Sequence, residues 1–258
     1  MLTIDLKSAF YGNKQVLADV GFKIQPGQLV AILGDNGSGK TTLLKSIAGV
    51  HKTWQGKCQW DDKDLEALPL LERASAIAYL SQTTQSNFPF QVREIITLAR
   101  FRFREDSKTR DRMVLKAAEQ FAVSDLLERR ANELSGGEQQ RVMLARVFAQ
   151  ESAVALLDEP TAHLDLSHRL AVFQSFRKLC GQGISILCAT HDLDASLEYA
   201  DQLLLLQKGK PIDFGPVDEV VDRNGLTQLF RNAPVEWKRN PFSKRPQVVI
   251  HSSYEEKR

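Results

Sequence analysis

The chain has 258 residues, of which 43% are hydrophobic and 26% charged, and its formal net charge is +2. This composition excludes fibrous and disordered chains and fits a globular protein with one large domain or two small ones. No apolar run reaches the roughly 18–20 residues that span a bilayer, and the first residues do not form a secretory signal. Three cysteines without C-x-x-C spacing indicate free thiols in a cytosolic protein.

Short apolar runs separated by helical stretches predict an α/β fold. Residues 1–30 and 58–60 alternate polar and apolar side chains, which favours an antiparallel sheet layer. Continuous apolar runs predict parallel strands that are covered on both faces. In chain order these runs are 28–33, 76–80, 154–157, 184–188 and 203–206.

A helical insertion is predicted from about residue 86 to residue 149. Its helices are expected at 92–103, 110–121 and 138–149, where apolar residues recur every three or four positions. From about residue 226 we expect a helix and then a short strand at 247–250. Residues 231–258 hold seven basic and three acidic side chains, so they form a basic tail with the solvated surface that is usual for such tails. The preceding 230 residues then sum to −2, which predicts no general attraction for nucleic acid.

The sequence Gly-Asp-Asn-Gly-Ser-Gly-Lys-Thr at 34–41 fits the phosphate-loop motif G-x-x-x-x-G-K-[ST]. It follows a predicted strand and opens a predicted helix at 40–48, which is the context that the motif requires. Lys40 is expected to reach the β- and γ-phosphates, and Thr41 to hold Mg²⁺. Backbone N–H groups and the helix N-terminus are expected to bind phosphate. The predicted nucleotide-binding residues of this region are Gly34, Asp35, Asn36, Gly37, Ser38, Gly39, Lys40, Thr41 and Thr42.

A second motif, at 154–160, carries two carboxylates to the end of a buried strand. Asp158 can bind Mg²⁺ directly or through water, and Glu159 can polarise an attacking water. Taken alone, the pair also fits a solvated strand end. Together with the phosphate loop, it indicates hydrolysis of a nucleoside triphosphate.

The third motif, Leu-Ser-Gly-Gly-Glu-Gln-Gln-Arg at 134–141, places Ser135 as a helix N-cap before two glycines. One nucleotide needs one phosphate loop, so a second anion-binding helix start implies a second surface for the same phosphate. On these motifs the chain resembles the ATP-binding subunits of ABC transporters, over about residues 2–229. The resemblance implies a P-loop NTPase core with an antiparallel β layer and a helical signature subdomain. It assigns residues 1–230 to the ATPase domain and leaves 231–258 as the tail.

The resemblance also implies roles for single residues. Tyr11 matches the aromatic residue that stacks on adenine, with Phe10 as its competitor. Gln82 matches a glutamine that contacts Mg²⁺ and senses the membrane partner. Asp165 matches a loop that crosses the dimer interface, and His191 a histidine that contacts the γ-phosphate. The expected catalytic residues are therefore Glu159, His191, Lys40 and Gln82, the metal ligands Thr41, Gln82 and Asp158, and the second-surface residues Ser135, Gly136, Gly137 and Asp165.

The implied cofactors are ATP and Mg²⁺, and the implied partners are proteins. Two copies would pack head to tail, with each ATP between Lys40 of one copy and residues 135–137 of the other. A separate transmembrane permease would dock near Gln82 and the insertion, and a substrate-binding protein would act indirectly. The chain would lie peripherally on the cytoplasmic face of the bacterial inner membrane. Phe88 and Phe90 either help to form the docking surface or fold under the insertion. The basic–aromatic alternation at 100–104 could stack on nucleic acid, but a helix end at a partner surface fits it better.

Segments 88–92, 226–230 and 246–250 look like those of haem-importer ATPases in the metal-chelate importer group. Ferric-siderophore and vitamin B12 importers are the alternatives. An exporter ATPase and a non-transport ABC ATPase fit less well, because the chain has one motif set and no room for long coiled-coil or zinc insertions. The sequence departs from the family pattern in two small ways: Asp35 stands where proline is common, and Ala-His at 162–163 replaces a frequent Ser-Ala. Neither is expected to touch a catalytic position.

Overall fold

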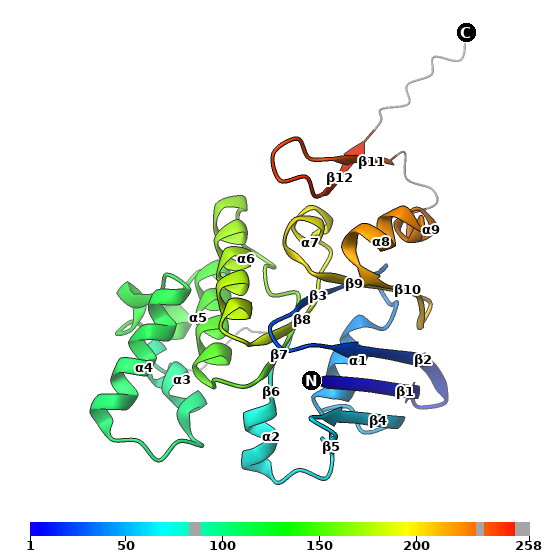
Figure 1. Ribbon diagram of the computed structural model, residues 1–258. Coiled ribbons are helices and arrows are strands. Elements are labelled where there is room, and N and C mark those ends of the chain that lie inside the picture. The colour runs from blue at the N-terminus through cyan, green and yellow to red at the C-terminus, as the bar shows by residue number, and fades with distance from the viewer. Residues whose placement is uncertain (83–88, 231–234, 251–258) are drawn as a thin grey trace.

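The computed structural model describes residues 1–82, 89–230 and 235–250. A six-stranded sheet in the order β10-β9-β3-β8-β7-β6 forms the centre of the fold (Figure 1). Five strands run parallel, and β10 adds an antiparallel edge. The strands are β3 (Leu29–Leu33), β6 (Ile77–Leu80), β7 (Val154–Asp158), β8 (Ser185–Ala189), β9 (Gln202–Gln207) and β10 (Lys210–Pro216). The five predicted apolar runs are the five parallel strands, which confirms the predicted fold class.

A second, antiparallel sheet in the order β2-β1-β4-β5 forms a separate layer. Helix α1 (Lys40–Ile47) places Leu43, Leu44 and Ile47 in one buried cluster with residues of both sheets. These apolar side chains therefore hold the antiparallel layer beside the start of α1. The strands of this layer are β1 (Leu2–Tyr11), β2 (Lys14–Ile24), β4 (Trp54–Trp60) and β5 (Lys63–Asp64), and a short helix, α2 (Leu70–Ala76), leads into β6.

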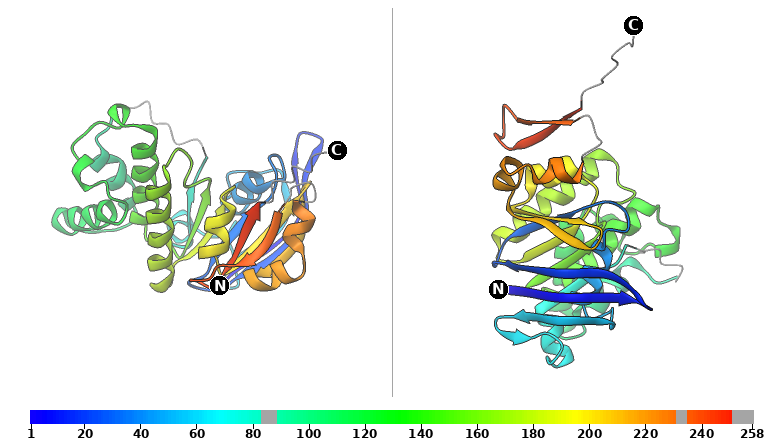
Figure 2. Two further views of the ribbon diagram at one scale, coloured as in Figure 1. Left: turned by 90° about the horizontal axis from the view of Figure 1, so that it is seen from above. Right: turned by 90° about the vertical axis from the view of Figure 1, so that its right-hand side faces the viewer.

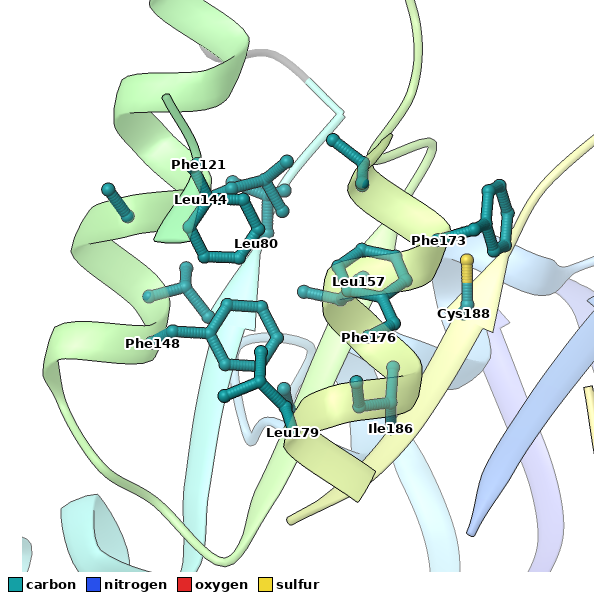
Figure 3. Packing of buried hydrophobic residues seen from close by; sticks show 14 of the residues in the cluster. Leu80, Phe121, Leu144, Phe148, Leu157, Phe173, Phe176, Leu179, Ile186 and Cys188 are labelled. Atoms are coloured by element: carbon teal, nitrogen blue, oxygen red, sulfur yellow. The ribbon is translucent and has the colours of Figure 1, made fainter. Parts of the chain in front are cut away.

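The opposite face of the central sheet is covered by helices that carry aromatic side chains. Phe173 and Phe176 of α6 (Leu166–Gly181) lie over Leu157 of β7 and Ile186 of β8 (Figure 3). The ring of Phe176 lies 5.9 Å from that of Phe148, which belongs to the helical subdomain. This shared core fixes the subdomain against the sheet.

The helical subdomain stands to one side of the core (Figure 2, left, green). The helix predicted at 138–149 begins two residues earlier, because Ser135 caps it and both glycines enter its first turn. The helix predicted at 110–121 also begins earlier, after its cap Asp106. The elements are α3 (Val92–Thr97), the 3₁₀ helix η1 (Leu98–Arg100), α4 (Ser107–Gln120), the 3₁₀ helices η2 (Ser124–Leu126) and η3 (Ala131–Glu133), and α5 (Gly136–Ala149).

The predicted helix at 92–103 is too long, because Arg100 turns inward. Its side chain is 3% exposed, and it pairs with Glu105 at 2.8 Å and Glu151 at 2.7 Å. The guanidinium of Arg100 also lies 3.7 Å from the centroid of the Phe103 ring. The basic–aromatic alternation is thus partly engaged in packing within the chain, while Phe101 remains 59% exposed.

The C-terminal part is more structured than a helix and one strand. After α7 (Leu193–Tyr199), α8 (Val217–Asp222) and α9 (Gly225–Leu229), strands β11 (Val235–Arg239) and β12 (Pro246–Ile250) form an antiparallel hairpin. Trp237 donates a hydrogen bond to Thr227 at 3.1 Å, and Arg245 donates one to the carbonyl of Leu197 at 3.1 Å. Part of the basic tail therefore packs on the body of the protein. Among the described residues, no helix has the length and apolar character to cross a membrane.

Candidate functional site

The phosphate loop joins the end of β3 to the start of α1 and needs glycine for steric reasons. A Cβ atom on Gly34 would lie 2.3 Å from the carbonyl oxygen of Leu206. Gly39 has φ of +104°, and a Cβ there would lie 2.5 Å from the side chain of Leu17. The loop is therefore wedged between β9 and β2, with no space for larger residues at these two positions.

The side chain of Lys40 lies over this loop. Its Nζ donates hydrogen bonds to the carbonyls of Gly34 at 2.6 Å and Asp35 at 3.3 Å, and lies 3.4 Å from Nε2 of His191. Burial lowers the pKa of Lys40, although the carboxylates of Glu159 and Asp158 oppose this shift. The result is a buried cation at the phosphate loop.

Asp158 ends β7 directly beside α1. Thr41 Oγ1 donates a hydrogen bond to its Oδ1 at 3.1 Å, and burial raises the pKa of the Asp158 carboxyl. Its Oδ2 is buried and has no hydrogen-bond partner within the described parts of the chain. Magnesium in nucleotide sites is held by one or two protein oxygens together with substrate phosphates. A hydroxyl next to a carboxylate with one free oxygen fits that requirement.

Glu159 and His191 lie close together beside Lys40. Oε1 of Glu159 lies 3.3 Å from Nε2 of His191. Glu159 has φ of +50°, and its N–H donates to the carbonyl of Ala189 at 2.9 Å, which turns its side chain away from the strand. Burial raises the pKa of Glu159, while burial and the nearby Lys40 lower the pKa of His191. The lowered pKa favours the neutral imidazole of His191, and the raised pKa makes Glu159 a stronger base than an exposed glutamate.

Lys40, Thr41, Glu159 and His191 line a pocket of about 190 Å³, and Asp158 lies outside its lining. Gln82, at the end of β6, and Val16 of β2 also line it. Nothing in the sequence pattern singles out Val16, because its place depends on how the antiparallel layer packs against the phosphate loop. The lining residues are Val16, Asn36, Gly37, Ser38, Gly39, Lys40, Thr41, Thr42, Gln82, Glu159 and His191.

A second pocket, of about 440 Å³, is built around Ser135 at the start of α5. Ser135 and Glu138 cap the helix reciprocally, with the Ser135 N–H donating to Glu138 at 2.8 Å. Asp165 caps α6 and accepts a hydrogen bond from the His168 N–H at 2.9 Å, and this contact lowers the pKa of the Asp165 carboxyl. The lining residues are Ser135, Gly136, Gly137, Glu138, Arg141, His163, Leu164, Asp165 and His168.

Most of the predicted site residues thus divide into two groups on one chain, and Gly34, Asp35 and Asp158 line neither pocket. No residue in the described parts of the chain lines both pockets. His163 lies in the second pocket, with its carbonyl 3.2 Å from where a Cβ on Gly137 would stand. The histidine of the Ala-His departure at 162–163 therefore lies in the lining of the second pocket.

Tyr11 lies outside the lining of both pockets. It ends β1, is 49% exposed, and its ring lies 4.5 Å from that of His51. Phe10, the competing aromatic, is less exposed than Tyr11. Of the two aromatics considered for docking, Phe88 lies outside the described residues, and Phe90 is 48% exposed.

Comparison with known proteins gives a consistent family. Residues 17–162 match the ABC transporter family. The hemin import ATP-binding protein HmuV of Pseudomonas aeruginosa is 36% identical over 257 residues, which covers 96% of this chain and 99% of the relative. The protein of the same name from Hahella chejuensis is 32% identical over 249 residues, with 92% and 95% covered.

Two solved structures show the same fold. A metal-chelate type ABC transporter in an inward-facing conformation has a TM-score of 0.80 at 26% identity, with 98% of both chains covered. A dimeric ATP-binding cassette in a post-hydrolysis state with ADP and Pi has a TM-score of 0.76 at 25% identity, and the match covers 84% of this chain and 99% of that chain.

Proposed function

The chain belongs to the ABC transporter family, and from this premise we propose that it is the ATP-hydrolysing subunit of a hemin importer. The observation that carries the proposal is the division of the nucleotide-binding residues between two separate pockets of one chain. The relatives named above are hemin import proteins, which favours hemin over a ferric siderophore or vitamin B12 as cargo.

In the first pocket, the phosphate loop and Lys40 bind the ATP phosphates. Thr41, Gln82 and Asp158 would hold Mg²⁺, which supplies charge neutralisation at the phosphates when it is bound. Asp158 is suited to this role because its Oδ2 is buried and lacks a partner in the described structure. Tyr11 stacks on the adenine ring.

Glu159 acts on the attacking water and His191 on the terminal phosphate. Glu159 stands beside Lys40 and His191, where a water next to the γ-phosphate would lie within its reach. A carboxylate with a raised pKa is a stronger base than an ordinary glutamate. The lowered pKa of His191 keeps its imidazole neutral, so it can donate from one nitrogen and accept on the other.

A second copy completes the site. In a two-fold dimer each interface contact occurs twice, so Lys40 of each copy faces residues 135–137 of the other across one ATP. The loop that contains Asp165 crosses the same interface. Nucleotide therefore joins the two copies, and its hydrolysis separates them.

The dimer docks on a membrane permease at the cytoplasmic face of the inner membrane. Gln82 and the helical subdomain form the surface that contacts the permease. A substrate-binding protein delivers hemin to the permease from the outside. This chain has no direct contact with hemin, so specificity belongs to those partners.

The two-copy site is tested by mixing two inactive variants. Lys40→Ala removes the phosphate-binding cation from one half of the site, and Ser135→Arg blocks the other half. In a mixed dimer both defects fall in the same site, so the other site is intact. The mixture should form nucleotide-bound dimers, with at most about a quarter of all sites intact, while neither variant alone forms any. Absence of nucleotide-bound dimers from the mixture, when wild type forms them, would contradict the shared site.

The cargo is tested separately in the host. Deletion of the gene should prevent growth on hemin as the iron source and leave growth on a ferric siderophore unchanged. Complementation with Lys40→Ala controls for the need for ATP hydrolysis. Normal growth on hemin would exclude this cargo without affecting the ATPase mechanism.

A further inference from the structure

His51 supports the inner side of Tyr11. The two ring centroids are 4.5 Å apart, with an angle of 37° between the ring planes. Tyr11 is 49% exposed and His51 is 9% exposed. The tyrosine ring therefore has one side covered by an aromatic neighbour, while half of the residue's surface remains open to a ligand.

The position of His51 is fixed by the end of helix α1. Its N–H and that of Val50 both donate to the carbonyl of Lys45, at 3.0 and 2.9 Å. Tyr11 sits at the end of β1, beside the turn that leads to β2, and its partner across the hairpin is the exposed Lys14. The helix end thus holds His51 in place, whereas Tyr11 at the exposed end of its strand depends on a neighbouring side chain to fix the position of its ring.

The Nε2 atom of His51 does not explain the burial of this side chain. Nε2 is inaccessible to solvent and has no hydrogen-bond partner among the atoms of the described residues. A buried polar atom without a partner normally costs free energy. The ring contact with Tyr11 is therefore the interaction that this side chain contributes, and Nε2 is too deeply buried to reach a bound base.

We infer that His51 is a positioning residue for the adenine of ATP, an inference that rests on the ATPase function proposed above. By holding the Tyr11 ring in place before ATP arrives, it removes part of the cost of ordering that ring on binding. The free-energy cost of ordering one such side chain on binding corresponds to about a two- to tenfold change in affinity. The effect is limited to ligands that carry a base.

The experiment compares two ligands on the full-length protein by calorimetry. MgATP carries the base, and Mg-tripolyphosphate has the phosphates alone. His51→Ala removes the ring, His51→Leu keeps an apolar side chain without a ring, and His51→Phe keeps a ring without nitrogen atoms. Tyr11→Ala is the control that removes the stacking residue itself.

His51→Ala and His51→Leu should weaken MgATP binding about two- to tenfold and leave tripolyphosphate binding unchanged. His51→Phe should bind MgATP as wild type does. If His51→Ala does not fold, His51→Leu gives the same comparison. Equal weakening of both ligands would reveal a general structural role, and unchanged MgATP binding in both variants would remove any role; either result overturns the inference. If Tyr11→Ala also binds MgATP normally, the stacking role of Tyr11 is wrong and the inference fails with it, whereas ATP hydrolysis by the wild type would still support the ATPase function.

Discussion

Glu159→Gln should lower ATP turnover and raise stability at the same time. Glutamate and glutamine side chains have nearly the same shape, so the pocket and the contact with His191 are kept. The carboxylate that is proposed to act on water is lost. Removal of a general base costs about 10²–10⁴ in rate, which corresponds to about 3–5 kcal/mol in the activation barrier. The variant should still bind ATP and accumulate as an ATP-bound dimer.

The stability effect follows from the direction in which the Glu159 pKa is shifted. Burial raises this pKa above its ordinary value of 4.5, so the ionised form is disfavoured in the folded state. Above the folded-state pKa the wild type bears the full cost of this ionised group, and the neutral glutamine does not. Below the ordinary value both folded and unfolded wild-type chains are protonated and the cost disappears. The variant should therefore have the higher Tm at neutral pH, and the difference should shrink as the pH falls through the window above 4.5.

The assays are phosphate release, size-exclusion chromatography with MgATP, and thermal unfolding at several pH values. Glu119→Gln is the matched control, because Glu119 is exposed on α4 and lines neither pocket. It should change none of the three measurements. A Glu159→Gln variant that keeps a tenth or more of the turnover would refute the catalytic role assigned to this carboxylate. A lower Tm at neutral pH would refute the cost assigned to its burial.

Three further substitutions test other parts of the structure. Ser135→Arg should abolish hydrolysis and keep nucleotide binding by the single chain, measured by calorimetry, because Ser135 lies outside the phosphate-loop pocket; unchanged hydrolysis would contradict the second surface. Gly34→Ala should lower the free energy of unfolding by about 1–3 kcal/mol in urea titrations, since its Cβ would lie 2.3 Å from a backbone oxygen of β9, and normal stability would show that the loop can shift. Arg100→Met should cost about 3 kcal/mol because it leaves Glu105 and Glu151 unpaired; a loss below about 1 kcal/mol would match a surface ion pair instead.

Features that depend on local sequence could be predicted. Each of the five parallel strands is a continuous apolar run, and each helix start that is proposed to bind phosphate has its own glycines and cap within a few residues. Parallel strands end at one edge of a sheet, which is enough to bring the phosphate loop, Asp158 and His191 together.

Features that depend on distant partners could not be predicted. The end of α3 and η1 is set by the burial of Arg100 against Glu151, which is 51 residues away in sequence. Val16 enters the pocket because β2 packs on the phosphate loop, and His51 reaches Tyr11 because α1 and β1 end near each other. Strand β11 has no continuous apolar run, and it is held by pairing with β12 and by the contacts of Trp237. In each case the deciding interaction joins two elements that are distant in the sequence, and the hydrophobic pattern of either element alone does not reveal it.

The two pockets of one chain are joined by the segment between Asp158 and Asp165. Gln140 of α5 is 1% exposed, and its side chain donates hydrogen bonds to the carbonyls of Glu159 at 3.3 Å and Pro160 at 2.9 Å. The helix whose N-terminus would face one ATP of the dimer is therefore bonded to the backbone beside the carboxylate that would act on the other ATP. These two hydrogen bonds therefore connect the start of the second pocket's helix, α5, to the backbone beside Glu159 within one chain.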